Sequence, residues 1–375
     1  MFNFLKGLSV FSGTIIGVGI FGLPYVASKA GFSVVLAYFL FLTVIAVVIH
    51  LMYAEVSLGM GKIHQFPGAV GMHLGPRWKK FTFITTSLGL IGALLAYLIV
   101  GGNFLYSFFS PSFGGGVLLY TLLFFAAGAF FIFRGVKSIS LIELLLLLVF
   151  FVILAAFFIK SMPHIDVNYL KGMDLSFFVL PYGVILFALW GSNIIPEVKD
   201  IVRGSRKMLR RVVISGTLLA SVTYLFFIYV ILGVSGPDTS KEAISGLVQA
   251  LDNGIVRFGF IFGVITCFTS FITLGLSLKN ILYRDFGVNR KLSWLITCSL
   301  PLLLFFAGAR EFIEVIGLTG AVAVGIMGII IVFLYKEFIA RKFSRKISRF
   351  AYILPAVFVL GVVLEIFSFF AKNIS

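Results

Sequence analysis

Long apolar runs divide this sequence at intervals, and they constrain its fold more than any motif does. An α-helix rises about 1.5 Å per residue, so crossing about 30 Å of hydrocarbon takes roughly 20 apolar residues. Eleven runs approach or exceed that length, at residues 7–28, 33–57, 81–109, 116–133, 140–159, 175–196, 212–233, 256–282, 292–307, 311–335 and 351–370. The sequence therefore predicts an all-α polytopic membrane protein with eleven spans.

Composition supports the same class. Of the 375 residues, 60% are hydrophobic and 12% are charged, and the mean hydropathy is +1.13. Soluble domains carry about twice that charged fraction. The first run lacks a small-residue cleavage site, so we do not interpret it as a signal peptide. We predict a single transmembrane domain over residues 1–375.

Lysine and arginine gather on one side of the predicted membrane. If the N-terminus is cytoplasmic, 23 of the 30 basic residues fall in cytoplasmic segments. Cytoplasmic loops carry such an excess, so we predict a multi-pass protein of the cell membrane with its N-terminus inside and its C-terminus outside. Topology and contact with anionic lipid headgroups then explain the net charge of +16, and we expect no nucleic acid partner.

The first run contains the pattern G-x-G-x-x-G, formed by Gly17, Gly19 and Gly22. In dinucleotide-binding proteins this pattern follows a strand, and an acidic residue comes about 20 positions later. Here the next acidic residue is Glu55, and Pro24 interrupts the helix that would follow. A dinucleotide site is disfavoured, so the glycines need another explanation.

Spans one and six share a weak point, because Gly191 precedes Pro196 in span six much as Gly22 precedes Pro24 in span one. In hydrocarbon a helix unwinds only where its freed backbone groups face protein, ligand or water. Close helix packing by small residues is the alternative explanation. Two interruptions five spans apart are typical of an inverted-repeat transporter. The repeats would cover about 7–160 and 175–335, followed by an extra helix at about 351–370.

Several segments resemble a known family. "SGTIIGVGIFGLPYVASKAGF", "LFALWGSNIIPEVKDIVRGSRKMLRRVVISG" and "CFTSFITLGLSLKNILYRDF" resemble the first, sixth and eighth spans of amino acid permeases of the amino acid/polyamine/organocation (APC) superfamily. Eleven spans and "LLAYLIVGGN" resemble more closely the amino acid/auxin permeases and the hydroxy/aromatic amino acid permeases. The resemblance implies a LeuT-like fold of five plus five helices, with helices 1 and 6 interrupted, and a secondary transporter of amino acids.

The breaks suit a zwitterion without any charged side chain. Backbone N–H groups freed at the start of a half-helix stabilise a carboxylate, and we expect Val18 and Gly19, beside Gly17, to supply them. The preceding half-helix ends in free carbonyls that suit an ammonium group. We expect these carbonyls to come from Ile15 in span one and from Phe187 or Ala188 in span six.

The remaining pocket residues should contact the substrate's side chain. Phe21, Phe187 and Trp190 flank the two breaks, Gly191 lies in the second, and Tyr97 in span three could direct its hydroxyl at the carboxylate. Lipid or core packing is the alternative for each aromatic residue. An apolar, aromatic-lined pocket favours neutral L-amino acids, including bulky or aromatic ones.

Span eight suggests a cation site. In "TCFTS", Thr266, Thr269 and Ser270 fall on one helical face. In sodium-coupled relatives of the resembled fold, one carbonyl and two hydroxyls at this spacing complete a Na⁺ site with two carbonyls of span one. By position, those carbonyls belong to Gly13 and Ile16. The alternative is that the hydroxyls only bond back to the preceding helical turn.

Proton coupling remains a second possibility for the ion. Some proton-coupled relatives place a lysine of span five in the cation position, but span five has no interior lysine here. This favours Na⁺, although the aromatic permeases that the chain resembles are often proton-coupled. Among titratable groups within the spans, His50 has an ordinary pKa near neutrality. We expect no other cofactor, and the oligomeric state is not predicted.

Two connecting segments carry further expectations. Residues 236–254 have helical periodicity, with Ala243, Leu247 and Leu251 on one face, and should cap the outer entrance. Residues 61–80 should form the counterpart on the inner side.

Other classes of protein fit less well. An enzyme would need a nucleophile and base or a metal cluster in the bilayer, and the corresponding motifs are missing. A channel would need a symmetric polar filter. A non-transporting amino acid sensor would share the pocket, and only flux separates it from a carrier. We therefore expect a cation symporter of neutral amino acids that works by alternating access.

Overall fold

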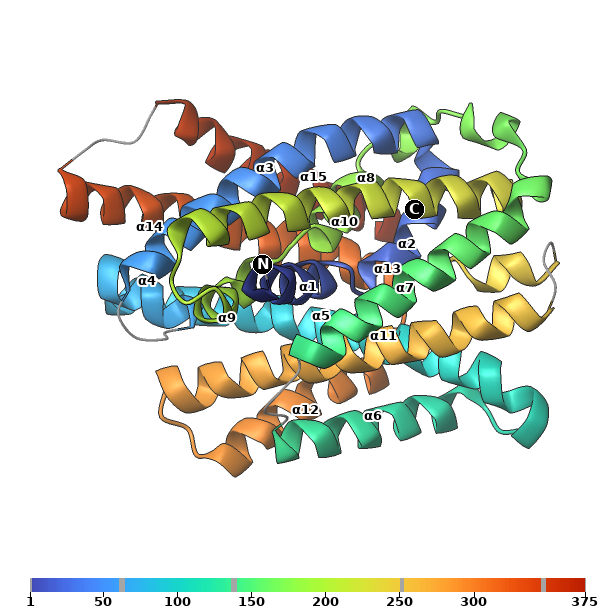
Figure 1. Ribbon diagram of the computed structural model, residues 1–375, viewed down its shortest axis with the longest axis horizontal. Coiled ribbons are helices and arrows are strands. Elements are labelled where there is room, and N and C mark those ends of the chain that lie inside the picture. Colours follow the sequence, from blue (N-terminus) through green and yellow to red (C-terminus); the bar gives the residue numbers. More distant parts are fainter. Residues whose placement is uncertain (1, 61–64, 136–139, 250–252, 345–348, 375) are drawn as a thin grey trace.

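A computed structural model of the chain describes residues 2–60, 65–135, 140–249, 253–344 and 349–374. Helices build nearly all of this part of the chain, and no strand occurs in it (Figure 1). The long helices are α1 (Phe2–Ile15), α2 (Gly19–Ala30), α3 (Phe32–Gly59), α5 (Pro76–Phe113), α6 (Val117–Arg134), α7 (Ser140–Ser161), α10 (Arg206–Ser235), α11 (Asn253–Asn280), α12 (Arg290–Phe306), α14 (Gly325–Phe343) and α15 (Ile353–Ile374). The shorter helical elements are α4 (Phe66–Leu74), η1 (Met162–His164), η2 (Val167–Leu170), η3 (Leu175–Phe177), α8 (Leu180–Ala188), η4 (Ser192–Ile194), α9 (Ile195–Ile201), η5 (Gly236–Asp238), η6 (Ser245–Gln249), η7 (Ile281–Asp285), α13 (Phe312–Leu318), η8 (Thr319–Val324) and η9 (Arg349–Tyr352).

The predicted spans one and six are interrupted. Helices α1 and α2 meet at a bend of 50° across residues 16–18. Span six consists of α8 and α9, separated by residues 189–191 and the short 3₁₀ turn η4. The prediction that helices 1 and 6 are broken is therefore confirmed.

By length and apolar composition, eight described helices could cross a membrane, or nine when α1 and α2 count as one span. The other two predicted spans are present as shorter elements. One is the interrupted pair α8 and α9, and the other is α12, which has 17 residues. The chain is thus a multi-pass membrane protein, and two of the eleven predicted spans correspond to short helices.

Burial separates central from peripheral helices. In their most apolar windows, 72% of α5 and 67% of α10 are buried, against 33% of α6 and 11% of α15. The broken spans lie in the middle of the bundle, and α6 and α12 lie along its lower edge in the view shown (Figure 1). The best-buried surface therefore surrounds the two breaks.

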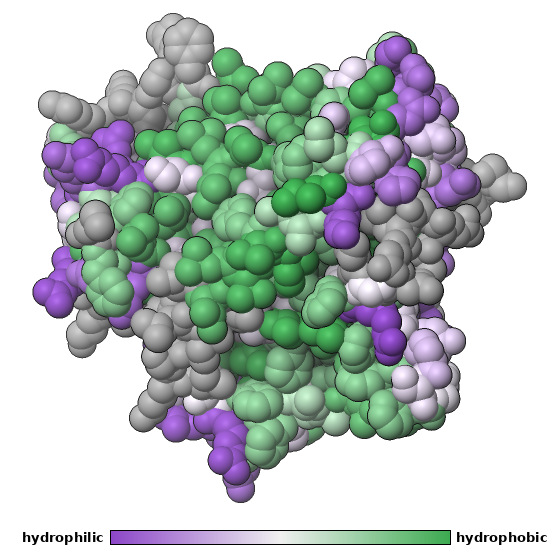
Figure 2. All heavy atoms as spheres, turned by 45° about the vertical axis from the view of Figure 1, so that its right-hand side comes forward, coloured by the Kyte–Doolittle hydropathy of each residue, from purple (hydrophilic) through white to green (hydrophobic). Residues whose placement is uncertain are grey.

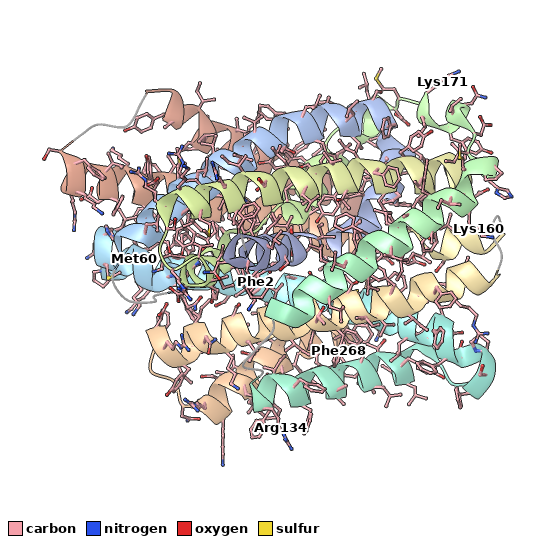
Figure 3. The ribbon with its side chains drawn as sticks, in the orientation of Figure 1. Phe2, Met60, Arg134, Lys160, Lys171 and Phe268 are labelled. Atoms are coloured by element: carbon pink, nitrogen blue, oxygen red, sulfur yellow. The ribbon has the colours of Figure 1, made fainter. Side chains whose placement is uncertain are left out.

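The surface is consistent with a bilayer environment. One face carries a broad apolar region, with hydrophilic residues mainly at its two ends (Figure 2). Lys160 and Lys171 lie together at one end of the long axis, and Met60 lies toward the other (Figure 3). Large exposed side chains on the peripheral helices, such as Leu148 and Phe367, are apolar and suit contact with lipid tails.

The predicted helix over residues 236–254 is not an α-helix at residues 236–249, and residues 253 and 254 belong to α11. The chain instead forms the 3₁₀ turns η5 and η6, and residues 250–252, including Leu251, lie outside the described residues. Pro237 lies at the start of η5, and Ala243 adopts a positive φ of 67°, which ends any regular helix there. Ala243 and Leu247 are nevertheless both buried, as the shared face predicted.

The connection between spans two and three does contain a helix. It is α4, which begins with Pro67 at its first turn and packs against α5 and α14. Its Gly68 N–H donates to the carboxylate of Asp285, at the end of η7, at 3.0 Å. This contact links the connection to the end of span eight.

Candidate functional site

The geometry of the first break depends on Gly17. The Gly17 N–H donates to the Ile15 carbonyl at 2.7 Å, and α2 then restarts through Ile20 N–H to Gly17 O at 3.3 Å. A Cβ atom at Gly17 would lie 1.9 Å from the Tyr97 hydroxyl oxygen. Glycine is therefore required where Tyr97 of α5 reaches the break.

At the second break, Gly191 contacts residues of α3 and α1. The Gly191 N–H donates to Nε2 of His50 at 3.0 Å. A Cβ atom at Gly191 would lie 2.7 Å from Cγ1 of Ile15. The two breaks are thus in direct contact, with Ile15 of the first packed on Gly191 of the second.

A second close approach joins the same elements. At Gly19, the first residue of α2, a Cβ atom would lie 2.8 Å from Cβ of Ala188 and 2.9 Å from its Cα. Because one of these atoms is backbone, a side chain at position 19 could not be accommodated by a rotamer change. The glycines of span one therefore serve both the break and close packing, the two explanations that the sequence left open.

A cavity of about 50 Å³ lies at the junction of the breaks. That volume exceeds what one water molecule needs but is far smaller than a drug-sized pocket. Seven of the ten residues predicted to bind substrate line it: Ile15, Gly17, Gly19, Tyr97, Phe187, Ala188 and Trp190. Sequence reasoning had not included Asn193 or Thr319, which add polar groups to the lining.

The other three predicted residues, Val18, Phe21 and Gly191, do not line this cavity. Phe21 is 1% exposed and packs edge-on against Phe104 and Phe227, with ring centroids 4.9 and 6.2 Å apart. Phe104 follows Tyr97 by seven residues on α5, a distance of about 10 Å along the helix. Phe21 thus belongs to an aromatic cluster that closes the cavity toward the C-terminal end of α5, while Gly89 and Met327 line its opposite end.

Tyr97 links the breaks to span eight. Its hydroxyl interacts with the side chain of Ser270 and with the backbone of Val18. Tyr97 is 3% exposed, so its hydroxyl lies in the protein interior beside the first break. The Val18 backbone, expected to face a substrate carboxylate, therefore lies close to the Tyr97 hydroxyl.

A separate small cavity, of about 40 Å³, lies between α1, α7 and α11. All five residues predicted for a Na⁺ site line it: Gly13, Ile16, Thr266, Thr269 and Ser270. The Thr269 hydroxyl lies 3.1 Å from the Ile265 carbonyl and 3.2 Å from that of Thr266, so it bonds back to its own helix. Such a hydroxyl keeps lone pairs for a cation, so this bond does not decide between the two explanations.

The two cavities share lining residues, Thr14 and Leu274. The two cavities therefore adjoin at the end of α1. Ser270, which lies next to Tyr97, lines the cavity between α1, α7 and α11. An ion in the cavity between α1, α7 and α11 would therefore lie close to a ligand in the cavity where the two breaks meet.

His50 lies behind the second break and is fully buried. Its Nδ1 atom is 3.4 Å from the Thr217 hydroxyl, which donates to the Val213 carbonyl at 2.9 Å. Because Nε2 accepts the Gly191 N–H, His50 is neutral in this conformation with its proton on Nδ1. The imidazole packs between Phe11 and Trp190, with ring centroids 5.5 and 5.7 Å away.

Sequence reasoning also missed Tyr224. Its side chain extends from α10 and is fully buried, and its hydroxyl donates to the carbonyls of Ile15, at 2.5 Å, and Ala188, at 3.0 Å. These are two of the carbonyls expected to face an ammonium group. A signal was available in the spacing of Thr217, Ser221 and Tyr224, which places three polar side chains on one face of α10.

The sequence pattern of the tryptophan/tyrosine permease family matches residues 2–371. The chain belongs to this family. The permease is accordingly a membrane transporter for amino acids, and its relatives and structural neighbours are transporters rather than enzymes.

Two characterised relatives span most of the permease. Tyrosine-specific transport system 1 of Haemophilus influenzae is 26% identical over 339 residues, which cover 82% of each chain. Glutamine transporter 2 of Aliivibrio fischeri is 23% identical over 344 residues, covering 86% of each chain.

Solved structures agree with the LeuT-like fold. MhsT in complex with L-phenylalanine superposes with a TM-score of 0.71 at 17% identity, covering 98% of both chains. The inward-facing conformation of Mhp1 gives 0.71 at 13% identity, covering 99% of the permease and 91% of Mhp1. The expected fold of five plus five helices with an eleventh is thus confirmed, whereas the exact repeat boundaries stay a prediction.

Proposed function

We propose that the permease is a secondary active transporter of neutral aromatic L-amino acids that works by alternating access around the two breaks. The observation that carries this proposal is the cavity where the breaks meet. Among the described residues that line it, none carries a charge, and aromatic side chains contribute much of the wall. A zwitterion held by backbone groups fits such a site, because helix ends supply partial charges of both signs.

The substrate class rests on the wall of that cavity. Phe187 and Trp190 offer apolar surface, and the buried Trp190 Nε1 has no hydrogen-bond partner among the described residues. A phenolic or indole side chain can use both features. The tyrosine-specific relative supports an aromatic substrate, and the glutamine relative makes glutamine the competing candidate.

For the binding mode, we propose that Val18 and Gly19 N–H groups receive the carboxylate and that the Ile15, Phe187 and Ala188 carbonyls receive the ammonium. The cavity extends from the breaks toward the N-terminal half of α5. With the N-terminus inside, this half is cytoplasmic, so the cavity would lie on the cytoplasmic side of the Phe21 cluster.

For the coupling ion, we propose Na⁺ in the cavity lined by Gly13, Ile16, Thr266, Thr269 and Ser270. Carbonyl and hydroxyl oxygens without full charge suit a weakly bound monovalent cation. Thr269→Ala should abolish stimulation of uptake by Na⁺ while leaving amino acid exchange measurable. Undiminished Na⁺ dependence in this variant would remove the site from consideration.

Proton coupling is the second candidate, and the contacts of His50 favour it. A protonated imidazole cannot accept the Gly191 N–H, so a proton at His50 would release the second break. His50→Gln keeps an acceptor but does not titrate in this range. If protons drive transport, this variant should exchange amino acids but no longer accumulate them under a pH gradient.

The deciding experiment is uptake of labelled tyrosine, tryptophan, phenylalanine and glutamine into proteoliposomes, with sodium and proton gradients imposed separately. We expect an aromatic amino acid to accumulate under one gradient. Binding without flux would instead indicate an amino acid sensor, and accumulation of glutamine alone would overturn the proposed substrate class.

Two further assignments complete the proposal. Membership of the APC superfamily, near the eleven-span amino acid/auxin and hydroxy/aromatic amino acid permeases, is supported by the segments quoted above from spans one, six and eight. A cytoplasmic N-terminus and an external C-terminus are supported by the excess of basic residues on one side.

A further inference from the structure

The hydroxyl of Tyr224 lies between the ends of two broken helices. It is 2.5 Å from the carbonyl oxygen of Ile15, the last residue of α1, and 3.0 Å from that of Ala188, the last residue of α8. The Tyr224 side chain is fully buried. One side chain from α10 therefore bridges both halves of the site.

The electrostatics of this position call for a hydrogen-bond donor. The C-terminal end of a helix carries partial negative charge and carbonyls without intrahelical partners. Two such ends meet here, in surroundings from which water is largely excluded. The Ile15 carbonyl also accepts the Gly17 N–H, but the Ala188 carbonyl has Tyr224 as its described side-chain donor.

A tyrosine hydroxyl meets this need only in part. It carries one proton, so it can satisfy one of the two carbonyls fully at any moment. An ammonium group carries three protons and a full charge, and it binds carbonyls more strongly. The amino group of a substrate can therefore take over these carbonyls from Tyr224.

The rest of α10 holds Tyr224 in place. Ser221, one turn earlier, lies 2.7 Å from the Thr43 hydroxyl of α3, and Thr217 contacts His50 of the same helix. The Tyr224 ring also packs against Phe39 of α3, with centroids 6.0 Å apart. The hydroxyl is thus fixed by the α3–α10 pair and does not depend on the broken helices for its position.

We propose that Tyr224 is a positioning residue that stands in for the substrate's ammonium group in the empty carrier. The inference rests on the proposed function, since it concerns the same site. In the empty state the hydroxyl ties the two breaks together, so the carrier can reorient without leaving two helix ends unpaired. In the loaded state the amino group of the substrate supplies the donors.

The test separates two modes of transport. Net uptake into empty vesicles requires the empty carrier to return, whereas exchange against internal amino acid does not. Tyr224→Phe removes the donor and keeps the ring. We expect net uptake to fall roughly tenfold or more, the effect of leaving buried carbonyls unpaired, while exchange of the same labelled amino acid stays within about twofold.

A matched control is available on α3. Tyr53 is also fully buried, and its hydroxyl has no partner among the described residues. Tyr53→Phe makes the same chemical change without removing a hydrogen bond, so both modes should stay as in the wild type. Exchange by Tyr224→Phe itself reports that the variant is folded.

A rescue variant covers the case in which Tyr224→Phe does not fold. Replacement of Tyr224 by 4-aminophenylalanine keeps an N–H donor at the same place and should retain net uptake. Equal loss of both modes in folded Tyr224→Phe, no loss in either, or failure of the rescue variant to support net uptake would each overturn the proposal. If the wild type neither accumulates nor exchanges any amino acid, the proposed function itself fails.

Discussion

Gly17 is the residue on which the geometry of the first break most depends. It lets the Tyr97 hydroxyl approach the backbone, and through Tyr97 it connects α1 and α2 to Ser270 on α11. No rotamer of another residue could offer that space, because the contact is made at the position of Cβ itself. The break and the cation cavity therefore lie on either side of the Tyr97 hydroxyl.

At this scale we expect Gly17→Ala to abolish amino acid binding, because its Cβ would meet the Tyr97 oxygen at 1.9 Å. Adding Tyr97→Phe should restore part of the binding, since the nearest ring atom, Cζ, would then be 3.1 Å away. Equilibrium binding of a labelled aromatic amino acid measures both effects.

Gly172→Ala is the control for this pair. Nothing lies within 4 Å of a Cβ at Gly172. The Gly172→Ala variant should therefore bind the labelled amino acid as the wild type does. Full binding by Gly17→Ala would mean that Tyr97 moves aside freely, contrary to its buried position.

Among the elements, α8 packs closely on α13 and η8 beside the site. A Cβ at Gly320 of η8 would lie 1.9 Å from the Gly183 carbonyl oxygen, and a Cβ at Gly183 would lie 2.3 Å from the carbonyl oxygen of Gly317 in α13. Both obstacles are backbone atoms. The π-helical turn η8 therefore packs directly on the first half of span six, beside the cavity that Thr319 lines.

We predict that Gly320→Ala destabilises the fold by about 1–3 kcal/mol, the usual cost of overpacking. Gly325→Ala, in the same span, is the control, because its Cβ would lie 3.2 Å from Cγ2 of Val362 and 3.9 Å from the Phe358 carbonyl oxygen. Thermal unfolding in detergent compares the two. A Gly320→Ala variant as stable as Gly325→Ala would show that α8 and η8 can separate at little cost.

The loop after α10 is tied to α13 by an ion pair between Lys241 and Glu311. Glu311 raises the pKa of Lys241. A raised pKa in the folded state means that the stabilisation is complete below the ordinary lysine value of 10.5 and is lost as the pH rises through the folded-state value. Because both side chains are about half exposed, the pair contributes little, well under about 1 kcal/mol.

Lys241→Gln should therefore lower the unfolding temperature slightly at low salt and at a pH well below 10.5, and the difference from the wild type should shrink as the pH rises above 10.5 or as salt is added. Unfolding scans under these conditions check this expectation. A difference that persisted at high pH and high salt would assign Lys241 a role in packing instead.

For the whole molecule, orientation in the membrane can be tested with cysteine labels, because both native cysteines are buried and should react slowly. Lys171→Cys, in the connection between α7 and α8, should react with a membrane-impermeant maleimide in intact cells. Arg77→Cys, at the start of α5, should react only after permeabilisation. The reverse pattern would invert the topology and place the Phe21 cluster on the cytoplasmic side.

Much of the fold follows from local sequence properties. The lengths of the apolar runs predicted the helices, because a segment within the bilayer must satisfy its own backbone hydrogen bonds. Glycine followed by proline located both breaks, at Gly17 and Gly191. Short-range signals failed over residues 236–249, where Pro237 and the positive φ of Ala243 replaced the expected helix with 3₁₀ turns.

The sequence by itself determined which backbone segments form the site, because interruptions of a helix are encoded by adjacent residues. Only the tertiary structure decided the partners, because these come from distant helices. It brought Tyr224 to the Ile15 and Ala188 carbonyls and His50 to the Gly191 N–H, and it moved Phe21 from the pocket wall into the aromatic cluster. A polar side chain in a membrane helix must find a partner, but which group it reaches depends on how the helices pack.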